Sequence, residues 1–336
     1  MRLAVHPILV LSVVVILIWL PSPVYTADPG TRPVEGAGIS GQKTGSVLFY
    51  PLFSSNAATP GQEDTRLSIT NTNTVNSITI HLMLINGSGG VPAMVEFYFG
   101  LTQSQTFSFQ VSEIHPGVRG YAVAVAVDRS TGCPVNFNYL SGSEYIKLAT
   151  GHAANLGAEA VSALKTEGLT ACDDNATSAT LRFDDLAYER LPRVLAIQKM
   201  RSPADGNSML LVLNRIGGSL VPGEGGPTSI GTVTGELIDN LAASYPYSHL
   251  GDKPQLVTPL SNTFPITTPV FDAVIAAGKT GWLTVSGGDV GLLGAAINYH
   301  PNTSSTATAF NGGHNLRKLN TASATTLTIP VSPPQM

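Results

Sequence analysis

Histidine and cysteine are the residue types of this chain best suited to metal binding or nucleophilic chemistry, yet their spacing predicts neither. The seven histidines are scattered singly, and no two have the i, i+4 spacing that places two imidazoles on one helix face. His152 and His314 each follow a glycine in matching parts of the two halves of the chain. They could act as ligands or catalytic bases, but an imidazole hydrogen-bonded to the backbone of a shared turn is the simpler interpretation. We expect no metal site and no cofactor.

Cys133 and Cys172 are the only cysteines of the chain. They form no C-x-x-C motif and have no histidine cluster beside them, which disfavours a redox or metal role. In an oxidising compartment such a pair closes a disulfide, and closing this loop stabilises a fold by about 4 kcal/mol on chain-entropy grounds. We therefore predict a disulfide between them. The alternative is two buried thiols that do not meet.

Acidic and glycine-rich motifs give weaker signals. Asp173-Asp174 and Asp184-Asp185 resemble calcium-binding oxygens, but adjacent acids are commonly a solvated turn, and no D-x-D-x-D-G run accompanies them. Residues 36–41 match the glycine pattern of dinucleotide-binding loops without the preceding strand and following helix that this binding needs. No G-x-S-x-G elbow or phosphate-binding loop occurs. We predict that the chain is not an enzyme; the alternative is a hydrolase with an unrecognised site.

Two short aromatic clusters are candidates for a ligand platform. One contains Phe97, Tyr98 and Phe99, and the other contains Tyr245 and Tyr247. Aromatic rings can stack on a sugar or another flat ligand, although core packing explains the first cluster and loop packing the second. These five residues are the predicted binding site if the protein is a binding module.

The N-terminus predicts export. Residues 8–20 are apolar apart from Ser12, follow Met1-Arg2 and end at Pro21, as in a signal peptide. Cleavage after Ala27 would give a signal peptide of residues 1–27, although Tyr25 is bulky for such a site. An uncleaved anchor is the alternative, although the apolar run is shorter than the roughly 20 residues of a spanning helix. We expect a secreted or cell-surface protein that meets a membrane only through this segment if it is uncleaved.

Composition indicates a folded, strand-rich protein. Charged residues make up 12% of the 336 residues, about half the usual share, while 34 glycines and 23 prolines predict frequent turns. The formal net charge is −4 and no cluster of lysine and arginine occurs. Because nucleic-acid binding needs a basic surface, we expect no nucleic-acid partner.

Short β-branched and aromatic segments predict strands throughout. Residues 66–70, 78–85 and 121–127 have this pattern, and the last alternates valine with alanine, so it presents one large and one small face. Residues 135–139 alternate apolar residues with asparagine, which predicts that they form an antiparallel hairpin with 121–127. Residues 155–165 are compatible with a helix or a strand.

The second half of the chain repeats features of the first. The recurring pairs are separated by 161, 160 and 162 residues: Gly120-Tyr121 and Gly281-Trp282, Asn138-Tyr139 and Asn298-Tyr299, Gly151-His152 and Gly313-His314. Such a period predicts repeated structural units. Residues 114–121 also resemble the tyrosine corner of immunoglobulin-like sandwiches. We predict an all-β fold of two tandem antiparallel β-sandwich, immunoglobulin-like domains, residues 46–191 and 192–336, after an N-terminal hydrophobic helix and a flexible leader of residues 28–45.

Low charge and undefended strand edges favour a structural role. We expect an exported cell-surface or extracellular structural protein that self-assembles through its strands as a homo-oligomer or polymer. The alternative is an extracellular module that binds a surface glycan or another ligand, or mediates adhesion.

Overall fold

The computed structural model describes residues 41, 43–90, 93–164, 172, 176–302 and 310–334. The predicted signal peptide, most of the leader and all but the last residue of the 36–41 glycine pattern lie outside these ranges. Within them, no helix is both long and apolar enough to cross a membrane.

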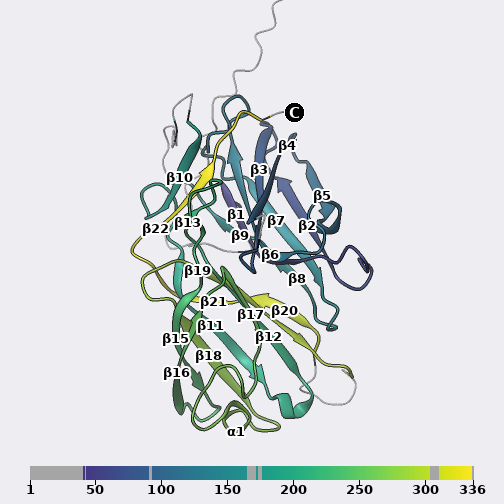
Figure 1. The fold of residues 1–336 in the computed structure, drawn as a ribbon, viewed down its shortest axis with the longest axis vertical. Helices are drawn as coiled ribbons and strands as arrows, with labels where there is room; N and C mark the ends of the chain where they lie inside the picture. Colours follow the sequence, from purple (N-terminus) through teal and green to yellow (C-terminus); the bar gives the residue numbers. More distant parts are fainter. Residues whose placement is uncertain are drawn as a thin grey trace, which may run out of the picture.

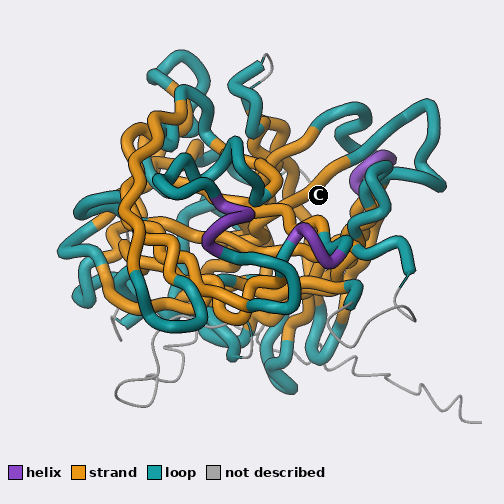
Figure 2. Tube along the Cα trace, turned by 90° about the horizontal axis from the view of Figure 1, so that it is seen from below, coloured by secondary structure: helices purple, strands orange, loops and turns teal. Residues whose placement is uncertain are grey.

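Strands are the main regular structure of the described residues, and loops and turns join them (Figure 2). Helical turns in the described part of the chain are limited to η1 (Val111–Glu113), η2 (Pro203–Asp205) and α1 (Phe271–Val274). The strands form five sheets, which we call A to E. The prediction of an all-β chain is therefore confirmed at this level.

Sheets A and B belong to the first half of the chain. Sheet A has the order β4 (Met94–Leu101), β3 (Ile78–Asn86), β6 (Arg119–Val127), β1 (Val47–Ser54) and β9 (Glu159–Val161). Sheet B has the order β5 (Thr106–Gln110), β2 (Asp64–Asn71), β7 (Leu140–Lys147) and β8 (Ala153–Gly157). Leu48, Leu82 and Ala124 of sheet A pack against Leu67 and Ile69 of sheet B.

Sheets D and E repeat this strand order in the second half. Sheet D has the order β16 (Ser244–Gly251), β15 (Gly231–Ile238), β18 (Thr280–Ser286), β11 (Pro192–Arg201) and β21 (Arg317–Thr321). Sheet E has the order β17 (Gln255–Pro259), β12 (Ser208–Arg215), β19 (Leu292–Tyr299) and β20 (Gly312–Asn315). The pairs β1/β6 and β11/β18 also share a register shift at the same place, which allows residue-by-residue comparison of the two halves.

Sheet C takes strands from both halves of the chain. Its order is β10 (Ser178–Phe183), β22 (Thr325–Pro330), β13 (Gly218–Ser219) and β14 (Gly226–Pro227). The yellow C-terminal strand β22 lies beside β10 in Figure 1, and the two pair antiparallel over six positions. We call sheets A, B and C the first lobe, and sheets D and E the second.

The prediction of two tandem immunoglobulin-like sandwich domains is wrong. The described residues form five sheets, as many as a five-bladed propeller has blades. The strands within each of these sheets, however, are not consecutive along the chain. The physical reason lies in β6, which is buried on both faces: Ala122 and Ala124 contact the sheet B side, and Val123 and Val125 contact the sheet C side. The first lobe therefore needs a third layer, and the end of the chain supplies part of it.

The predicted hairpin of residues 121–127 with 135–139 forms only at its turn end, where Val127 and Pro134 make an antiparallel bridge and the N–H of Val135 donates to the backbone oxygen of Ala126 at 2.9 Å. β6 lies in sheet A, the next strand β7 lies in sheet B, and residues 135–139 form no strand. The amide of Asn138 instead exchanges two hydrogen bonds with the backbone of Ala163, each 2.8 Å long. A side chain thus replaces the backbone pairing of a strand, and the chain crosses from one layer to the next. Residues 155–165 were compatible with a helix or a strand, and their described part contains the end of β8 and all of β9, so it forms strands.

Candidate functional site

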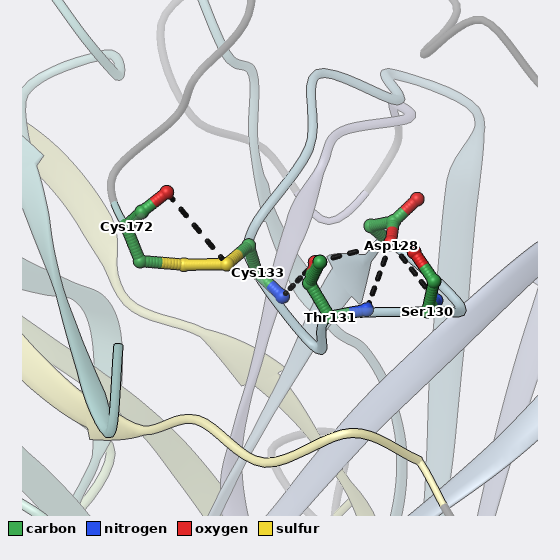
Figure 3. The surroundings of a disulfide bond; sticks show 5 residues. All are labelled: Asp128, Ser130, Thr131, Cys133 and Cys172. Carbon is green, nitrogen blue, oxygen red and sulfur yellow. Dashed lines mark hydrogen bonds between the residues drawn. A yellow bond between two sulfur atoms is a disulfide. The ribbon is translucent and has the colours of Figure 1, made fainter. Parts of the chain in front are cut away.

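The predicted disulfide between Cys133 and Cys172 is present (Figure 3). It joins residues 39 positions apart, with the two Cα atoms 6.0 Å from one another. Cys133 lies in the loop after β6, where Asp128 accepts backbone hydrogen bonds from Ser130 and Thr131, each 2.9 Å long. Partial burial alone raises the pKa of Asp128, but the hydrogen bonds from Ser130 and Thr131 lower it overall. The bond therefore fixes an already ordered loop at the end of sheet A.

The first predicted aromatic cluster is divided between the two faces of sheet A. Phe97 and Phe99 point toward sheet B, where the ring centroids of Phe99 and Phe107 are 4.7 Å apart. Tyr98 points to the opposite face and stacks on His81, with ring centroids 4.2 Å apart. The structure therefore does not bring these three rings into one platform.

The second predicted cluster points into the second lobe. Tyr247 is 6% exposed, its hydroxyl donates to the backbone oxygen of Thr284 at 2.8 Å, and its ring packs edge-on to Phe264. Tyr245 lies on the same side of β16 and packs against the same core. Burial raises the pKa of Tyr247 well above its ordinary value. Both rings are therefore packing residues in this structure.

The opposite face of sheet D is largely polar and carries two exposed apolar side chains, Trp282 and Leu250. Its side chains alternate along β15, β16 and β18 with the buried residues Val233, Leu237 and Val285. We call it the Trp282 face and define it by Thr234, Glu236, Ser248, Trp282 and Thr284. Trp282 is 42% exposed, and the hydrophobic clusters of the described residues place no further layer on this face. These strands lie along one side of the lower lobe in Figure 1.

The corresponding face of sheet A is largely apolar, apart from His81 and Tyr98 at the positions of Thr234 and Ser248, and sheet C packs over it. Pairing register relates the two sheets position by position because both share the same strand order. Tyr121, which is 2% exposed, corresponds to Trp282. The substitutions on going from sheet A to sheet D are Tyr121 to Trp282, Val123 to Thr284, Val125 to Ser286, and Met83 to Glu236. The same backbone thus presents a buried face in one lobe and a polar, open face in the other.

A groove of about 390 Å³ lies where the two lobes meet. Its lining residues include Asn86, Ser88, Arg119, Lys253 and Gln255. Arg119 is already paired with Glu63 at 3.0 Å, and the side-chain amide of Gln255 donates to the backbone oxygen of Pro51. These donors already have partners within the chain, so the residues that line the groove serve mainly to hold the lobes together.

The two glycine-linked histidines have different surroundings. His152 Nε2 donates to the backbone oxygen of Ser208 at 2.8 Å and so connects the two lobes, while His314 is exposed on β20. Burial lowers the pKa of His152, and the bond to Ser208 opposes this shift. The described ranges contain no group of three or more His, Cys, Asp or Glu side chains placed to hold a metal ion.

Of the two acidic pairs, the structure describes only Asp184-Asp185. Asp173-Asp174 lies outside the described residues. Asp184 Oδ1 accepts the backbone N–H groups of Leu186 and Ala187, each at 2.9 Å, as in an ordinary turn. Asp185 lies 3.4 Å from the guanidinium of Arg190. The second pair therefore organises the turn before Tyr188.

No protein-family model matches the chain, and no curated protein matches it. A solved structure entitled "Crystal Structure of Thermotoga maritima 1070" is similar at 10% sequence identity and a TM-score of 0.25. The match covers 34% of this chain and 93% of that one. A similarity of this strength supports no conclusion about fold or function, so the candidate site rests on geometry alone.

Proposed function

We propose that the protein is an exported binding module that holds a carbohydrate on the Trp282 face. Sugars present C–H surfaces that pack on an aromatic ring and hydroxyls that bond to polar side chains, and an indole combines apolar area with a polar N–H. Trp282 would supply the stacking surface, while Thr234, Ser248 and Glu236 would supply hydrogen bonds. The observation that carries this proposal is the replacement of a covered apolar face in sheet A by an open polar face with an exposed indole in sheet D.

Export is part of the same proposal. The apolar segment at residues 8–20 supports it, because it has the pattern of a signal peptide. The Cys133–Cys172 disulfide also supports it, because such bonds persist mainly in oxidising compartments. Finding the protein retained inside producing cells with reduced cysteines would contradict this part.

We propose binding without catalysis. Glycoside hydrolysis ordinarily needs two carboxylates across the scissile bond, and Glu236 is the one carboxylate among the residues that define the Trp282 face. Incubation with panels of glycoside, ester and peptide substrates should therefore give no turnover above that of a heat-denatured sample. Turnover that Glu236→Gln abolishes would overturn this part.

A glycan array followed by titration of the best hit tests the binding site. We expect Trp282→Ala to weaken affinity at least about tenfold, which equals ~1.4 kcal/mol. Tyr145→Ala is the matched control, because Tyr145 is 45% exposed on sheet B, away from this face, and its loss should leave binding unchanged. An array without hits, or a hit indifferent to Trp282→Ala, would contradict the proposal.

Self-assembly is a second candidate, favoured by strand β4. This eight-residue strand lies at the edge of sheet A, pairs with β3 alone, and contains no proline. Long edge strands without proline can pair with a second copy. Light scattering across concentration and salt should then show mass above that of a monomer, and a monomer at all concentrations would exclude it.

A further inference from the structure

Glu144 is a fully buried carboxyl group in the first lobe. It lies on β7, and its exposed fraction is 0%. Neither of its carboxyl oxygens has a hydrogen-bond partner of ordinary geometry. Buried charges are normally paired, because an unpaired carboxylate in the protein interior is strongly destabilising.

The second lobe has an alanine at the matching position. Glu144 pairs with Leu67 in sheet B, and Ala296 pairs with Leu211 in sheet E at the same place in the strand order. The two leucines also correspond, because β2 and β12 occupy equivalent positions. The repeated scaffold therefore folds without a carboxyl group here, and Glu144 is a feature that the first lobe adds to it.

We propose that Glu144 is an internal proton-binding site that makes the stability of the first lobe depend on pH. When protonated, the carboxyl is neutral and tolerates its apolar surroundings. When it ionises, the lobe must hydrate or expel the charge, which requires β7 to loosen.

The groups that face Glu144 offer no compensating charge. Tyr50 on β1 is the titratable neighbour, and its hydroxyl already donates to the backbone oxygen of Ser68 at 2.9 Å. The paired residues on β2 and β8 are Leu67 and Leu156, and no lysine, arginine or histidine among the described residues acts on the carboxyl. Burial raises the pKa of Glu144 well above its ordinary value, and the backbone amide of Leu52 offsets this only in part.

Loosening at Glu144 would reach the junction of the two lobes. Ile146 lies two residues further along β7 and belongs to the apolar cluster that joins the lobes. That cluster includes Leu52 and Leu156 of the first lobe with Val212 and Ile297 of the second. Glu144 is thus adjacent to the contact that holds the lobes together.

The sign of the effect follows from proton linkage. Below the ordinary carboxyl pKa of about 4.3, Glu144 is protonated in both the folded and the unfolded chain, so its full contribution to stability is present. Above that pH the folded chain binds one more proton than the unfolded chain. The unfolding equilibrium constant should therefore rise about tenfold per pH unit from this group, until the pH exceeds the folded-state pKa.

Carboxyl-carbon NMR titration of the full chain tests the proposal directly. We expect one glutamate signal to titrate well above the others, and that signal should be missing in Glu144→Gln. Urea unfolding between about pH 5 and pH 8 should show a smaller loss of stability with rising pH in Glu144→Gln than in the wild type. Glu224→Gln, at an exposed glutamate, should leave the pH dependence unchanged.

If Glu144→Gln fails to fold, Glu144→Met replaces it, because methionine has a similar length and needs no hydrogen-bond partner. The wild-type NMR titration requires neither variant. The proposal is overturned if every glutamate signal titrates in the ordinary range, or if both folded variants keep the wild-type pH dependence.

Discussion

Single residues decide what each repeated strand does. Tyr121 and Trp282 occupy the same register position, yet one is buried under sheet C and the other is exposed. Glu144 and Ala296 form a second such pair. Both differences change the chemistry of a lobe while the strand order stays the same, so we expect any function specific to one lobe to depend on such substitutions.

Gly235 is expected to tolerate no side chain. A Cβ at this position would lie 1.9 Å from the backbone oxygen of Thr284 and 2.8 Å from the ring of Tyr247. We expect Gly235→Ala to lower the free energy of unfolding by about 1–3 kcal/mol, the usual cost of overpacking, as measured by urea unfolding. Gly61→Ala is the control, since a Cβ there meets nothing within 4 Å. Equal stability of the two variants would show that the Gly235 contact is not tight.

The sequence contains the substitutions that accompany the exposure of Trp282. They can be recognised only when the pairing registers of sheets A and D are known. The sequence suggested Tyr245 and Tyr247 as a ligand platform, whereas the alternation of β16 places both on the buried side. The change from Val123 and Val125 to Thr284 and Ser286 indicates that one face becomes polar, once the repeat is aligned at Gly120 and Gly281. The cysteine pair needed no register because the chain contains only two cysteines. Glu144 could not be recognised from sequence, because a glutamate gives no local sign of burial.

At the scale of elements, β22 completes the first lobe from the far end of the chain. Leu327 and Ile329 pack with Leu181 and Phe183 over the outer face of sheet A. Local patterning predicted strands at residues 66–70, 78–85 and 121–127, all of which the structure contains. It could not predict the layer to which each strand belongs, because pairing between distant segments depends on packing and not on local periodicity.

Leu327→Asp should therefore destabilise the first lobe although the substitution lies in the last strand. An unpaired charge would replace a buried leucine, at an expected cost of about 3–5 kcal/mol in unfolding free energy. Thr326→Asp on the same strand is the control, because Thr326 is exposed and the variant should stay close to wild type. Circular dichroism during thermal unfolding measures both. A Leu327→Asp variant as stable as Thr326→Asp would mean that sheet C is not needed to cover sheet A.

At the scale of the whole molecule, the lobes are joined by mixed polar and apolar contacts. Asn214 and Gln255 of the second lobe both donate to the backbone oxygen of Pro51 in the first, at 2.8 and 3.1 Å. Lys318 forms an ion pair with Glu159, whose side chain is 3% exposed. The edge strands β8 and β20 also meet, since Asn315 Nδ2 donates to the backbone oxygen of Gly157 at 2.8 Å. These contacts cover strand edges that would otherwise be open to pairing.

Lys318→Ala should weaken this junction by removing the direct partner of the buried Glu159 carboxylate. We expect a loss of about 1–3 kcal/mol in unfolding free energy, because the ammonium is partly exposed and removing one member of a buried pair costs more than a surface pair. Lys253→Ala, which removes an exposed pair with Asp252, should change stability by less than about 1 kcal/mol. Urea unfolding of both variants provides the comparison, and equal losses would rule out a special role for the Lys318 contact.

Trp282 provides the most direct test of the central claim that the open face of sheet D binds carbohydrate. The chain has two tryptophans, and Trp19 lies within the predicted signal peptide, so a protein made without residues 1–27 has Trp282 as its single tryptophan. Titration of that form with an array-selected glycan should shift or quench its fluorescence with a saturable dependence on concentration, and Tyr145→Ala should behave in the same way. Saturable glycan binding that leaves the Trp282 emission unchanged would contradict the assignment of this face.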